Sequence, residues 1–265
     1  MVYGFIGTGN MGAAIIRGMA GSGSFDSDQI CAYNRTKEKA LALADECNVK
    51  VLDSADSVAK ASDVIMLCVK PQQMSGMLSS CDPDGFKGKL VISIAAGLPL
   101  SYYSENLPDS RIIRSMPNLN AKYLCSVTGI CPEDGISAED IATAKAIFGS
   151  IGSVFEIQEH LFPAFSAVAG ASPAFTFMYT DALAMAAVKA GIPRAQAFEI
   201  ASAAVKGSAV TLTESGEHPD ALRDKVCSPG GTTIEGVSVL ENAAFKGIVM
   251  DAVEAVIEKD KRMAK

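Results

Sequence analysis

The feature that most constrains this chain is a glycine pattern that follows a short apolar run near its start. Val2–Ile6 is long enough for one β-strand, and Met11–Ala20 has the pattern of a helix. Between and within them stand Gly7, Gly9 and Gly12, with the spacing G-x-G-x-x-G. The first glycine of such a unit permits a tight turn, the second lets a pyrophosphate approach the backbone, and the third lets helix and strand pack closely. The pattern therefore predicts a dinucleotide-binding turn, with a purely structural turn as the alternative.

Strand-like and helical runs alternate over the first 158 residues, which favours a dinucleotide-binding domain over an isolated turn. Such alternation produces parallel βαβ units with right-handed crossovers. We therefore predict an α/β fold that begins with a Rossmann-type domain and a parallel-rich sheet. Beyond the first strand and helix, the expected strands are Gln29–Tyr33, Val49–Leu52, Val64–Val69, Leu90–Ile94, Arg111–Ser115, Thr128–Cys131 and Val154–Ile157, and the expected helices are Lys37–Glu46 and Ala138–Ser150.

After residue 158 the strand-like runs stop and alanine-rich helical patterns take over. Gly191 and Pro193 end one helix and begin the next, since glycine is favoured after a helix and proline in a first turn. We predict two domains: residues 1–158 bind the dinucleotide, and residues 159–265 are all-α. The helices expected in the second domain are Leu161–Ala190, Arg194–Glu214, Ala221–Cys227, Thr232–Glu241 and Ala243–Lys261.

Composition limits the partners of the chain. Its 265 residues carry a formal net charge of −7, and basic residues cluster only at the chain end, so we expect no nucleic-acid partner. The seven cysteines are scattered without a C-x-x-C pair, which is typical of reduced thiols in the cytoplasm. Only two histidines occur, His160 and His218, and they are far apart in the sequence, so we expect neither a metal site nor a histidine-based hydrolase.

One uncharged stretch, Leu161–Thr180, has the length of a membrane span. It is rich in small and hydroxylated residues, it contains Pro163 and Pro173, and it has no basic flank. We interpret it as a buried helix of a soluble oligomer, and we expect no membrane partner.

The end of the second expected strand indicates which dinucleotide binds. An NAD-specific site places a carboxylate there, about 20 residues beyond the glycines, to bind the ribose hydroxyls. This chain has Asn34, Arg35 and Thr36 at that place. The guanidinium could pair with a 2′-phosphate, and the two polar side chains could donate hydrogen bonds to it. The segment therefore favours NADP, with simple capping of the helix that begins at Lys37 as the alternative.

Three further loops follow expected strands and should border the cofactor, because ligands of open α/β sheets bind beyond the strand C-termini. They contain Val69-Lys70-Pro71, Ile94-Ala95-Ala96 and Asn118, and the small side chains of the second leave room for a flat nicotinamide ring. The predicted cofactor-binding residues are Ile6, Gly7, Thr8, Gly9, Asn10, Met11, Gly12, Asn34, Arg35, Thr36, Val69, Lys70, Pro71, Ile94, Ala95, Ala96 and Asn118.

A second backbone feature interrupts the helical domain at Ser228-Pro229-Gly230-Gly231-Thr232-Thr233. The proline and glycines break one helix, and the threonines begin the next. Backbone N–H groups that converge at a helix N-terminus suit a small carboxylate. The alternative is a Ser/Thr helix cap.

Taken with Phe5-Ile6-Gly7, Val69-Lys70-Pro71, Ala95-Ala96-Gly97 and Met116-Pro117-Asn118, this motif closely resembles pyrroline-5-carboxylate reductase over essentially the whole chain. The resemblance implies reduction of 1-pyrroline-5-carboxylate to L-proline with NADPH or NADH. It also implies a homodimer formed by the C-terminal helices, and assembly of such dimers into a decamer.

The same resemblance implies the substrate site. Ser228, Gly230, Gly231 and Thr232 would bind the substrate carboxylate, Glu159 would lie near the substrate, and Thr233 would act as the catalytic hydrogen-bond partner of the ring nitrogen. The chain departs from the family at Ser54-Ala55-Asp56, where many members have Asn-x-Glu, and at Ala171-Ser172, where many have Ser-Gly.

Two alternatives are weaker. A β-hydroxyacid-dehydrogenase-type NADP oxidoreductase needs a lysine early in the first long helix of the second domain, but the first lysine there is Lys189, at the helix end. A non-catalytic NADP-binding sensor would not need the Ser228–Thr233 motif.

Overall fold

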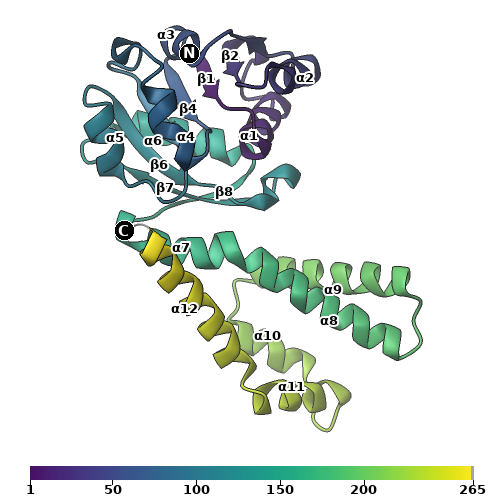
Figure 1. Cartoon of the computed structure of the whole chain (residues 1–265). Coiled ribbons are helices and arrows are strands. Elements are labelled where there is room, and N and C mark those ends of the chain that lie inside the picture. The colour runs from purple at the N-terminus through teal and green to yellow at the C-terminus, as the bar shows by residue number, and fades with distance from the viewer. Residues whose placement is uncertain (264–265) are drawn as a thin grey trace. The chain divides into compact units, whose positions relative to one another are not determined.

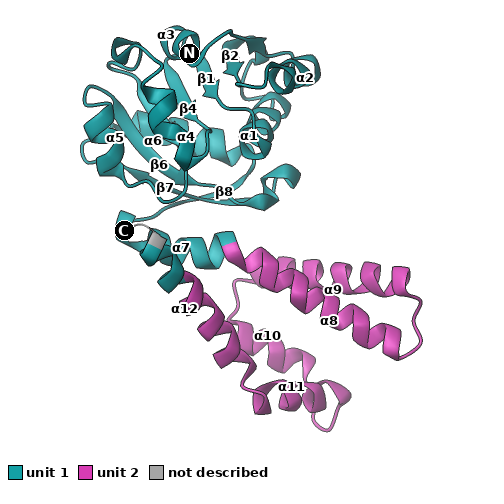
Figure 2. Ribbon diagram, in the orientation of Figure 1, with its two compact units in different colours: residues 1–170, 257–265 teal, residues 171–256 magenta. Residues whose placement is uncertain are grey.

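The computed structural model describes residues 1–263 and divides them into two compact units (Figure 2). One comprises Met1–Gly170 together with the end of the chain from Ile257, and the other comprises Ala171–Val256. The division at residue 170 lies inside a continuous helical stretch that starts at Glu159. A functional border between residues 158 and 159 remains a prediction, and residues 264–265 of the predicted second domain lie outside the described residues.

The first unit contains one eight-stranded sheet with the order β3-β2-β1-β4-β5-β6-β7-β8. From β1 the chain extends the sheet to one side, and it then returns through β4 to the other side, so the strand order reverses between β1 and β4 (Figure 1). This confirms the predicted Rossmann-type sheet and puts the expected ligand crevice at the C-terminal ends of those strands. The strands are β1 (Tyr3–Ile6), β2 (Ile30–Tyr33), β3 (Lys50–Val51), β4 (Val64–Leu67), β5 (Leu90–Ser93), β6 (Arg111–Met116), β7 (Ser126–Pro132) and β8 (Gly152–Glu156).

One strand direction differs from the rest: β7 runs antiparallel to β6. The connection between them contains only the 3₁₀ helix η3 (Leu119–Tyr123). A parallel neighbour needs a crossover of about a dozen residues or more. The short link therefore forces the chain to turn back, and β8 then pairs parallel to β7 after α6 (Ala138–Gly149).

Helices cover both faces of this sheet (Figure 1). On one face α1 (Asn10–Gly21), α2 (Lys37–Cys47) and α6 contribute buried residues such as Ile15, Leu43 and Phe148. On the other face α3 (Ala55–Ala61), α4 (Pro71–Leu78) and α5 (Leu100–Asn106) contribute buried residues such as Met74 and Tyr103. The helices α3, α4 and α5 were not among those predicted from the sequence, because seven or eight residues are too few for a clear helical period. Two short 3₁₀ turns, η1 (Ser27–Gln29) and η2 (Pro83–Gly85), complete the connections.

The predicted helix Leu161–Ala190 is helical but not uniform. It consists of η4 (Glu159–Leu161), α7 (Phe162–Phe165), a π-helical segment η5 (Ser166–Ala171) and α8 (Ser172–Lys189). Glu159–Lys189 is long and apolar enough to span a membrane, and only 17% of its most apolar window is buried within this chain. Its apolar side chains therefore need a covering that this single chain does not supply.

The second unit is a set of helices with a small core of its own. α8 and α9 (Arg194–Ser215) form a helical hairpin whose buried residues are Ala184, Ala197 and Ala201. They are followed by α10 (Pro219–Val226), α11 (Thr232–Asn242) and α12 (Phe245–Met263), of which only the part up to Val256 is assigned to this unit. Large apolar side chains remain exposed on these helices, among them Phe177, Met178, Val210, Val239, Ile248 and Met250.

Candidate cofactor and substrate sites

The three glycines of the fingerprint differ in how much room a side chain would have at each position. Gly7 has φ +108°, and a Cβ there would stand 2.7 Å from the carbonyl oxygen of Cys68. A Cβ on Gly12 would stand 2.4 Å from the carbonyl oxygen of Gly7. Around Gly9, by contrast, no atom of the described residues other than those of its immediate chain neighbours lies within 4 Å of a Cβ position. The turn and the helix packing thus exclude side chains, whereas the middle glycine opens onto free space.

The loop also carries a buried hydroxyl that needs a partner. Thr8 is 4% exposed, and its Oγ1 has no hydrogen-bond partner within residues 1–263. Gly9 caps α1 and supplies no side-chain acceptor for the N–H groups of the first turn. Burial raises the pKa of the neighbouring Cys68 thiol, which keeps that thiol uncharged. The open space, the orphaned hydroxyl and the uncapped helix N-terminus together fit an anionic group such as a pyrophosphate.

The segment Asn34-Arg35-Thr36, predicted to bind the 2′-phosphate, contains one side chain that is hydrogen-bonded within the protein and two that are exposed. Asn34 accepts a hydrogen bond from the backbone N–H of Thr8 at 3.0 Å, and its amide nitrogen donates to the carbonyl of Thr36 at 2.9 Å. The Asn34 side chain thus links the end of β2 to the glycine loop, a role that has no signal in the sequence. Arg35 is exposed, and Thr36 occupies the N-cap position of α2 without a side-chain hydrogen bond to the described helix.

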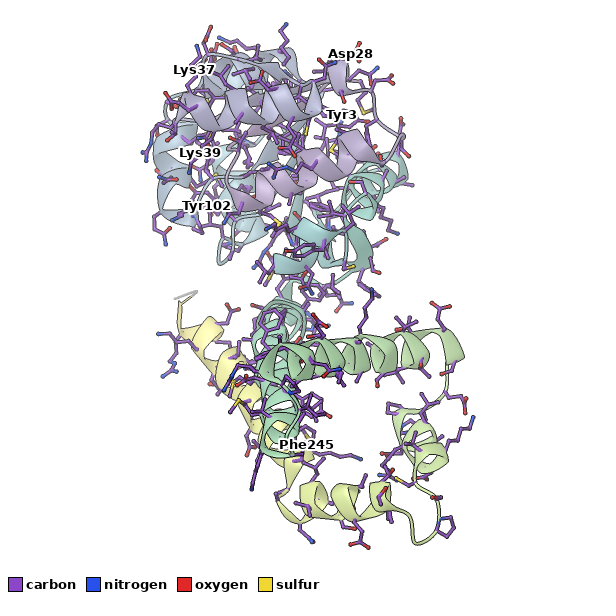
Figure 3. The ribbon with its side chains drawn as sticks, turned by 90° about the vertical axis from the view of Figure 1, so that its right-hand side faces the viewer. Tyr3, Asp28, Lys37, Lys39, Tyr102 and Phe245 are labelled. Carbon is purple, nitrogen blue, oxygen red and sulfur yellow. The ribbon has the colours of Figure 1, made fainter. Side chains whose placement is uncertain are left out.

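Two lysines follow on α2, where Figure 3 labels them. Lys37 pairs with Asp53 at 3.1 Å. Lys39 follows two residues later in the first turn of α2 and is also exposed. The start of α2 thus places two basic side chains close to Arg35 in the sequence, with Glu38 between them and Asp53 paired with Lys37. Arg35 is the cation there that could pair with an added 2′-phosphate.

The loops after β4 and β5 lie at the same sheet edge as the fingerprint. Lys70 is the N-cap of α4 and Pro71 its first residue. Ile94 donates its N–H to the carbonyl of Leu67 at 3.1 Å, so the ends of the two strands stay paired. Ala95 is buried, whereas Ala96 and Gly97 are exposed.

Asn118 is held by protein groups at both ends of its side chain. Its oxygen accepts from the N–H groups of Asn120 and Val127, and its nitrogen donates to the carbonyl of Ala169 at 2.8 Å. Ala169 lies in the π-helical segment, where the widened turn displaces carbonyls from the usual i→i−4 ladder. A cofactor contact by Asn118 remains a prediction, and the structure reveals a bridge from the loop after β6 to this π-helix that the sequence did not indicate.

The Ser228–Thr233 motif forms a tight turn in the second unit. Gly230 has φ +67°, Gly231 donates its N–H to the carbonyl of Ser228 at 3.0 Å, and α11 begins at Thr232. The N-cap is Gly231, and no side chain of the described residues caps this helix. The alternative of a Ser/Thr side-chain cap is therefore not realised, and the first N–H groups of α11 can receive a carboxylate.

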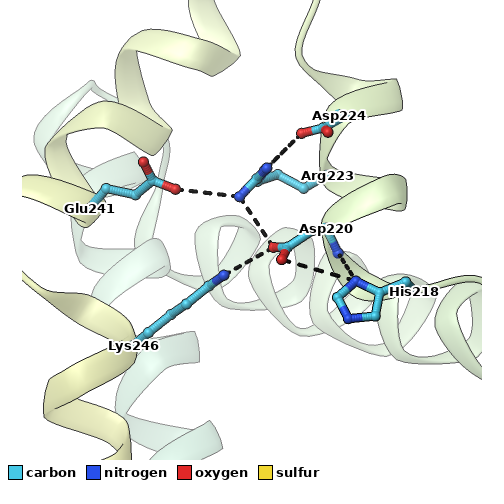
Figure 4. Close-up of polar contacts among 6 residues, drawn as sticks. All are labelled: His218, Asp220, Arg223, Asp224, Glu241 and Lys246. Atoms are coloured by element: carbon cyan, nitrogen blue, oxygen red, sulfur yellow. Dashed lines mark hydrogen bonds and ion pairs between the residues drawn. The ribbon is translucent and has the colours of Figure 1, made fainter.

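A network of ion pairs joins the helices on either side of this turn (Figure 4). Arg223 of α10 donates to Glu241 of α11 at 3.3 Å, and to Asp220 and Asp224 of its own helix at 3.1 and 2.7 Å. Lys246 of α12 reaches Asp220 at 3.0 Å. Arg223 belongs to the Leu222-Arg223-Asp224 segment that precedes the motif, and its role could not be assigned from the sequence.

Glu159, the predicted residue near the substrate, lies in the first unit. Its Oε1 accepts from the Arg114 guanidinium at 2.9 Å and from the backbone N–H of Leu100 at 2.7 Å. The residue borders an open hollow of about 820 Å³ that Leu100, Cys131 and Glu156 also line. The Glu159 carboxylate therefore already accepts hydrogen bonds from two protein donors. Its predicted contact with the substrate remains a proposal.

Comparison with known proteins identifies the family. The model described as pyrroline-5-carboxylate reductase dimerisation matches residues 159–263, and the one described as NADP oxidoreductase, coenzyme F420-dependent, matches residues 2–97. The chain is 43% identical to the pyrroline-5-carboxylate reductase of Escherichia coli over 99% of this chain and 98% of that protein. It is 36% identical to the enzyme of the same name from Methanosarcina acetivorans, over 99% and 97% of the two chains.

Solved structures agree with the sequence relatives. A pyrroline-5-carboxylate reductase from Coxiella burnetii superposes with a TM-score of 0.94 at 29% identity, over 99% of this chain and 98% of that one. A Plasmodium falciparum pyrroline carboxylate reductase with NADP bound gives a TM-score of 0.88 at 29% identity, over 100% and 98%. The predicted resemblance is confirmed, and this chain belongs to the pyrroline-5-carboxylate reductase family.

Proposed function

We propose that this chain reduces 1-pyrroline-5-carboxylate to L-proline, with NADPH as the preferred hydride donor and NADH as a weaker one. The observation that carries the proposal is the 43% identity to a reductase of that name, because the similarity spans both the fingerprint and the Ser228–Thr233 turn. The alternatives, a β-hydroxyacid-dehydrogenase-type enzyme and a non-catalytic sensor, have no comparable support over the whole chain.

Three features of the glycine loop in the first unit support NADP binding: open space at Gly9 and, among the described residues, an unpaired Thr8 hydroxyl and an uncapped helix N-terminus. The pyrophosphate would rest on the N–H groups of Gly9, Asn10 and Met11, with the orphaned hydroxyl of Thr8 as an additional partner. Arg35 and Thr36 would hold the 2′-phosphate, and the loops after β4 and β5 would border the nicotinamide. The bound dinucleotide supplies the hydride; this chain supplies position and electrostatics.

The substrate needs little chemistry from side chains, because a protonated imine carbon is already electrophilic. Backbone N–H groups around Gly230, Gly231 and Thr232 would bind its carboxylate, with Ser228 at the turn and Glu159 near the ring. The hydroxyl of Thr233 would hydrogen-bond the ring nitrogen and so orient the C=N bond. A hydroxyl is a weak acid at neutral pH, so the proton on that nitrogen comes from solvent. Positioning is then the main catalytic contribution of the protein.

The family is oligomeric through its C-terminal region, and we propose that this chain forms a homodimer through those helices. The exposed apolar side chains of α8, α9, α11 and α12 supply the surface that such contacts bury. Five such dimers would form the decamer that the resemblance implies. The seven free cysteines are consistent with the cytoplasm.

The reaction and its cofactor preference are tested together by steady-state kinetics with 1-pyrroline-5-carboxylate and either NADPH or NADH. We expect turnover with both and a lower KM for NADPH. In Arg35→Gln the KM for NADPH should rise about tenfold to a hundredfold while the KM for NADH stays unchanged, because only the 2′-phosphate loses its charged partner.

Lys122→Gln, which removes an exposed cation elsewhere in the same unit, is the matched control and should leave both constants unchanged. If the wild-type chain turns over neither dinucleotide, the proposed reaction is wrong. An unchanged KM for NADPH in Arg35→Gln would remove only Arg35 from the phosphate site.

A further inference from the structure

The loop Ile94–Pro99 is anchored at both ends by polar side chains from neighbouring elements. We propose that Ser93, Tyr103 and the Arg114–Glu159 pair are positioning residues that hold this loop in place against the nicotinamide ring. The proposal rests on the proposed function, since it assumes that the loop borders the ring during hydride transfer.

The first anchor stands at the start of the loop and is fully buried. The Oγ of Ser93 accepts the N–H of Ala95 at 3.2 Å and lies 2.6 Å from the hydroxyl of Tyr103. The Ser93 carbonyl in turn accepts from the hydroxyl of Ser115 on β6 at 2.8 Å. The Tyr103 hydroxyl carries its proton at neutral pH, and burial raises its pKa further, to about 12, so this hydroxyl can donate to Ser93. β5, β6 and α5 thus all fix the residue from which the loop departs.

The second anchor stands at the end of the loop. α5 begins at Leu100, and its N-cap, Pro99, offers no side-chain acceptor. Glu159, which lies 59 residues later in the sequence, takes the place of a side-chain cap by accepting a hydrogen bond from the Leu100 N–H at 2.7 Å. The same carboxylate oxygen binds Arg114, whose side chain is 13% exposed and whose guanidinium carbon lies 4.3 Å from the centre of the Phe162 ring. The arginine is therefore fixed by both stacking and charge, and it fixes Glu159.

The middle of the loop is exposed, whereas its flanks are packed: Ala95 is buried, and Leu98 packs against the same hydrophobic cluster as Tyr103. Gly97 has φ +79°, and both it and Ala96 are exposed rather than packed against the core. Small residues are needed there if a flat ring is to lie against the backbone, so Ala96 and Gly97 depend for their position on the packed flanks of the loop and on the two polar anchors. Misplacement of a reactant by about 1 Å can cost about a hundredfold in rate. Anchoring both ends of a small-residue loop is a direct way to avoid that loss.

Tyr103 also belongs to the hydrophobic core, so its positioning role must be separated from its packing. Tyr103→Phe removes only the hydroxyl and keeps the ring. The chain offers a matched control in Tyr102, the neighbouring tyrosine on α5, which Figure 3 labels. Its ring centre lies 5.3 Å from that of Tyr103. Within residues 1–263 the Tyr102 hydroxyl makes no hydrogen bond, so Tyr102→Phe changes the same group without breaking an anchor.

The test is steady-state kinetics of the wild type, Tyr103→Phe, Tyr102→Phe and Ser93→Ala, with NADPH carrying hydrogen or deuterium at the transferred position. A loosened loop slows hydride transfer itself. We expect kcat to fall about threefold to tenfold in Tyr103→Phe and further in Ser93→Ala, with a larger deuterium isotope effect and an unchanged KM for the substrate. Tyr102→Phe should match the wild type in all three quantities.

The outcomes separate the two proposals. If the wild type reduces 1-pyrroline-5-carboxylate and Tyr103→Phe has the same kcat and isotope effect, the anchoring role is wrong and the reaction stands. A fall in Tm and kcat at an unchanged isotope effect would make the hydroxyl merely structural, which also overturns the proposal. Absence of turnover in the wild type would instead overturn the proposed function.

Glu159→Gln tests the second anchor and separates it from the direct substrate contact. If Glu159 positions the loop, loss of its charge weakens the hold on Arg114, and the isotope effect rises while the substrate KM stays constant. A higher substrate KM at an unchanged isotope effect would show that the carboxylate contacts the substrate instead, and it would remove the Arg114–Glu159 pair from the proposal.

Discussion

At the residue scale, the dinucleotide turn depends on Gly7 and Gly12, where no Cβ fits, and on Thr8, whose buried hydroxyl lacks a partner within residues 1–263. Any side chain on Gly7 or Gly12 would overlap a backbone carbonyl, and the positive φ of Gly7 adds strain for every other residue. The sequence could predict the first two because glycine is needed wherever a Cβ cannot fit. It could not predict the buried hydroxyl, since burial depends on the assembled loops.

Thr233 is the residue on which the proposed chemistry most depends, since no other side chain of the Ser228–Thr233 turn is expected to meet the ring nitrogen. We predict that Thr233→Ala lowers kcat/KM for 1-pyrroline-5-carboxylate by about 10²–10³, the loss typical of one positioned polar group in an active site. Thr233→Ser keeps the hydroxyl and should recover most of the activity. Equal kinetics of wild type and Thr233→Ala would exclude the threonine from the site.

At the scale of the elements, the turn that should bind the carboxylate is held by the two helices that flank it. The Arg223–Glu241 pair crosses from α10 to α11, whereas the Arg223–Asp224 pair stays within α10. All of these groups are substantially exposed, so each pair contributes little to stability. Their effect should instead be on the spacing of the helices, and hence on the shape of the Ser228–Thr233 turn between them.

This arrangement predicts different results for two similar substitutions. Glu241→Gln breaks the bridge between the helices and should raise the substrate KM about twofold to fivefold, the range expected for one exposed ion pair. Asp224→Asn removes a carboxylate from the same arginine without breaking the bridge and should leave that KM unchanged. Kinetics at varied substrate concentration and saturating NADPH provide the measurement. Equal effects of the two substitutions would argue against a spacing role.

Short elements were harder to predict than long ones. α3, α4 and α5 have seven or eight residues each, and they pack on the sheet mainly through a few side chains such as Val58 and Met74. Their helical state is stabilised by tertiary burial rather than by intrinsic propensity. The π-helical segment likewise has no local signal. Its freed carbonyl at Ala169 is satisfied by Asn118, from a position 51 residues earlier.

At the scale of the whole molecule, the second unit leaves too much apolar surface exposed for a chain that remains alone. Met178 is 73% and Met250 is 70% exposed, and Phe177 and Val239 are more than half exposed. Large apolar side chains exposed in this number indicate an interface. It also explains why Glu159–Lys189 has the composition of a membrane span, since a helix covered by a partner needs the same apolar residues.

We therefore predict that the wild-type protein has a solution mass that is a multiple of 27.6 kDa, with two copies as the minimum. Met178→Glu should weaken the contact, because a carboxylate in an apolar interface loses its hydration. Light scattering coupled to size-exclusion chromatography measures the mass. Leu41→Glu, at an exposed apolar position on α2 in the first unit, should leave it unchanged. A wild-type mass of 27.6 kDa would contradict the predicted homodimer.

The sequence by itself determined the features that depend on single residue types and their spacing. These are the glycine turn after β1, the alternation of strands and helices, the all-α second part and the break at Ser228–Thr233. Each follows from a local rule: glycine where φ is positive or a Cβ cannot fit, apolar runs for buried strands, and proline and glycine where helices stop.

Only the tertiary structure decided which distant groups meet. The antiparallel direction of β7, the tie from Asn34 to Thr8, the Ser93–Tyr103 contact and the Arg114–Glu159 pair join residues that are 10 to 45 positions apart or belong to different elements. Polar groups such as these pair because burial leaves them no water, and their partners are set by packing rather than by neighbouring residues. The dinucleotide turn could therefore be recognised from twelve residues, whereas the groups proposed to hold its nicotinamide loop could not.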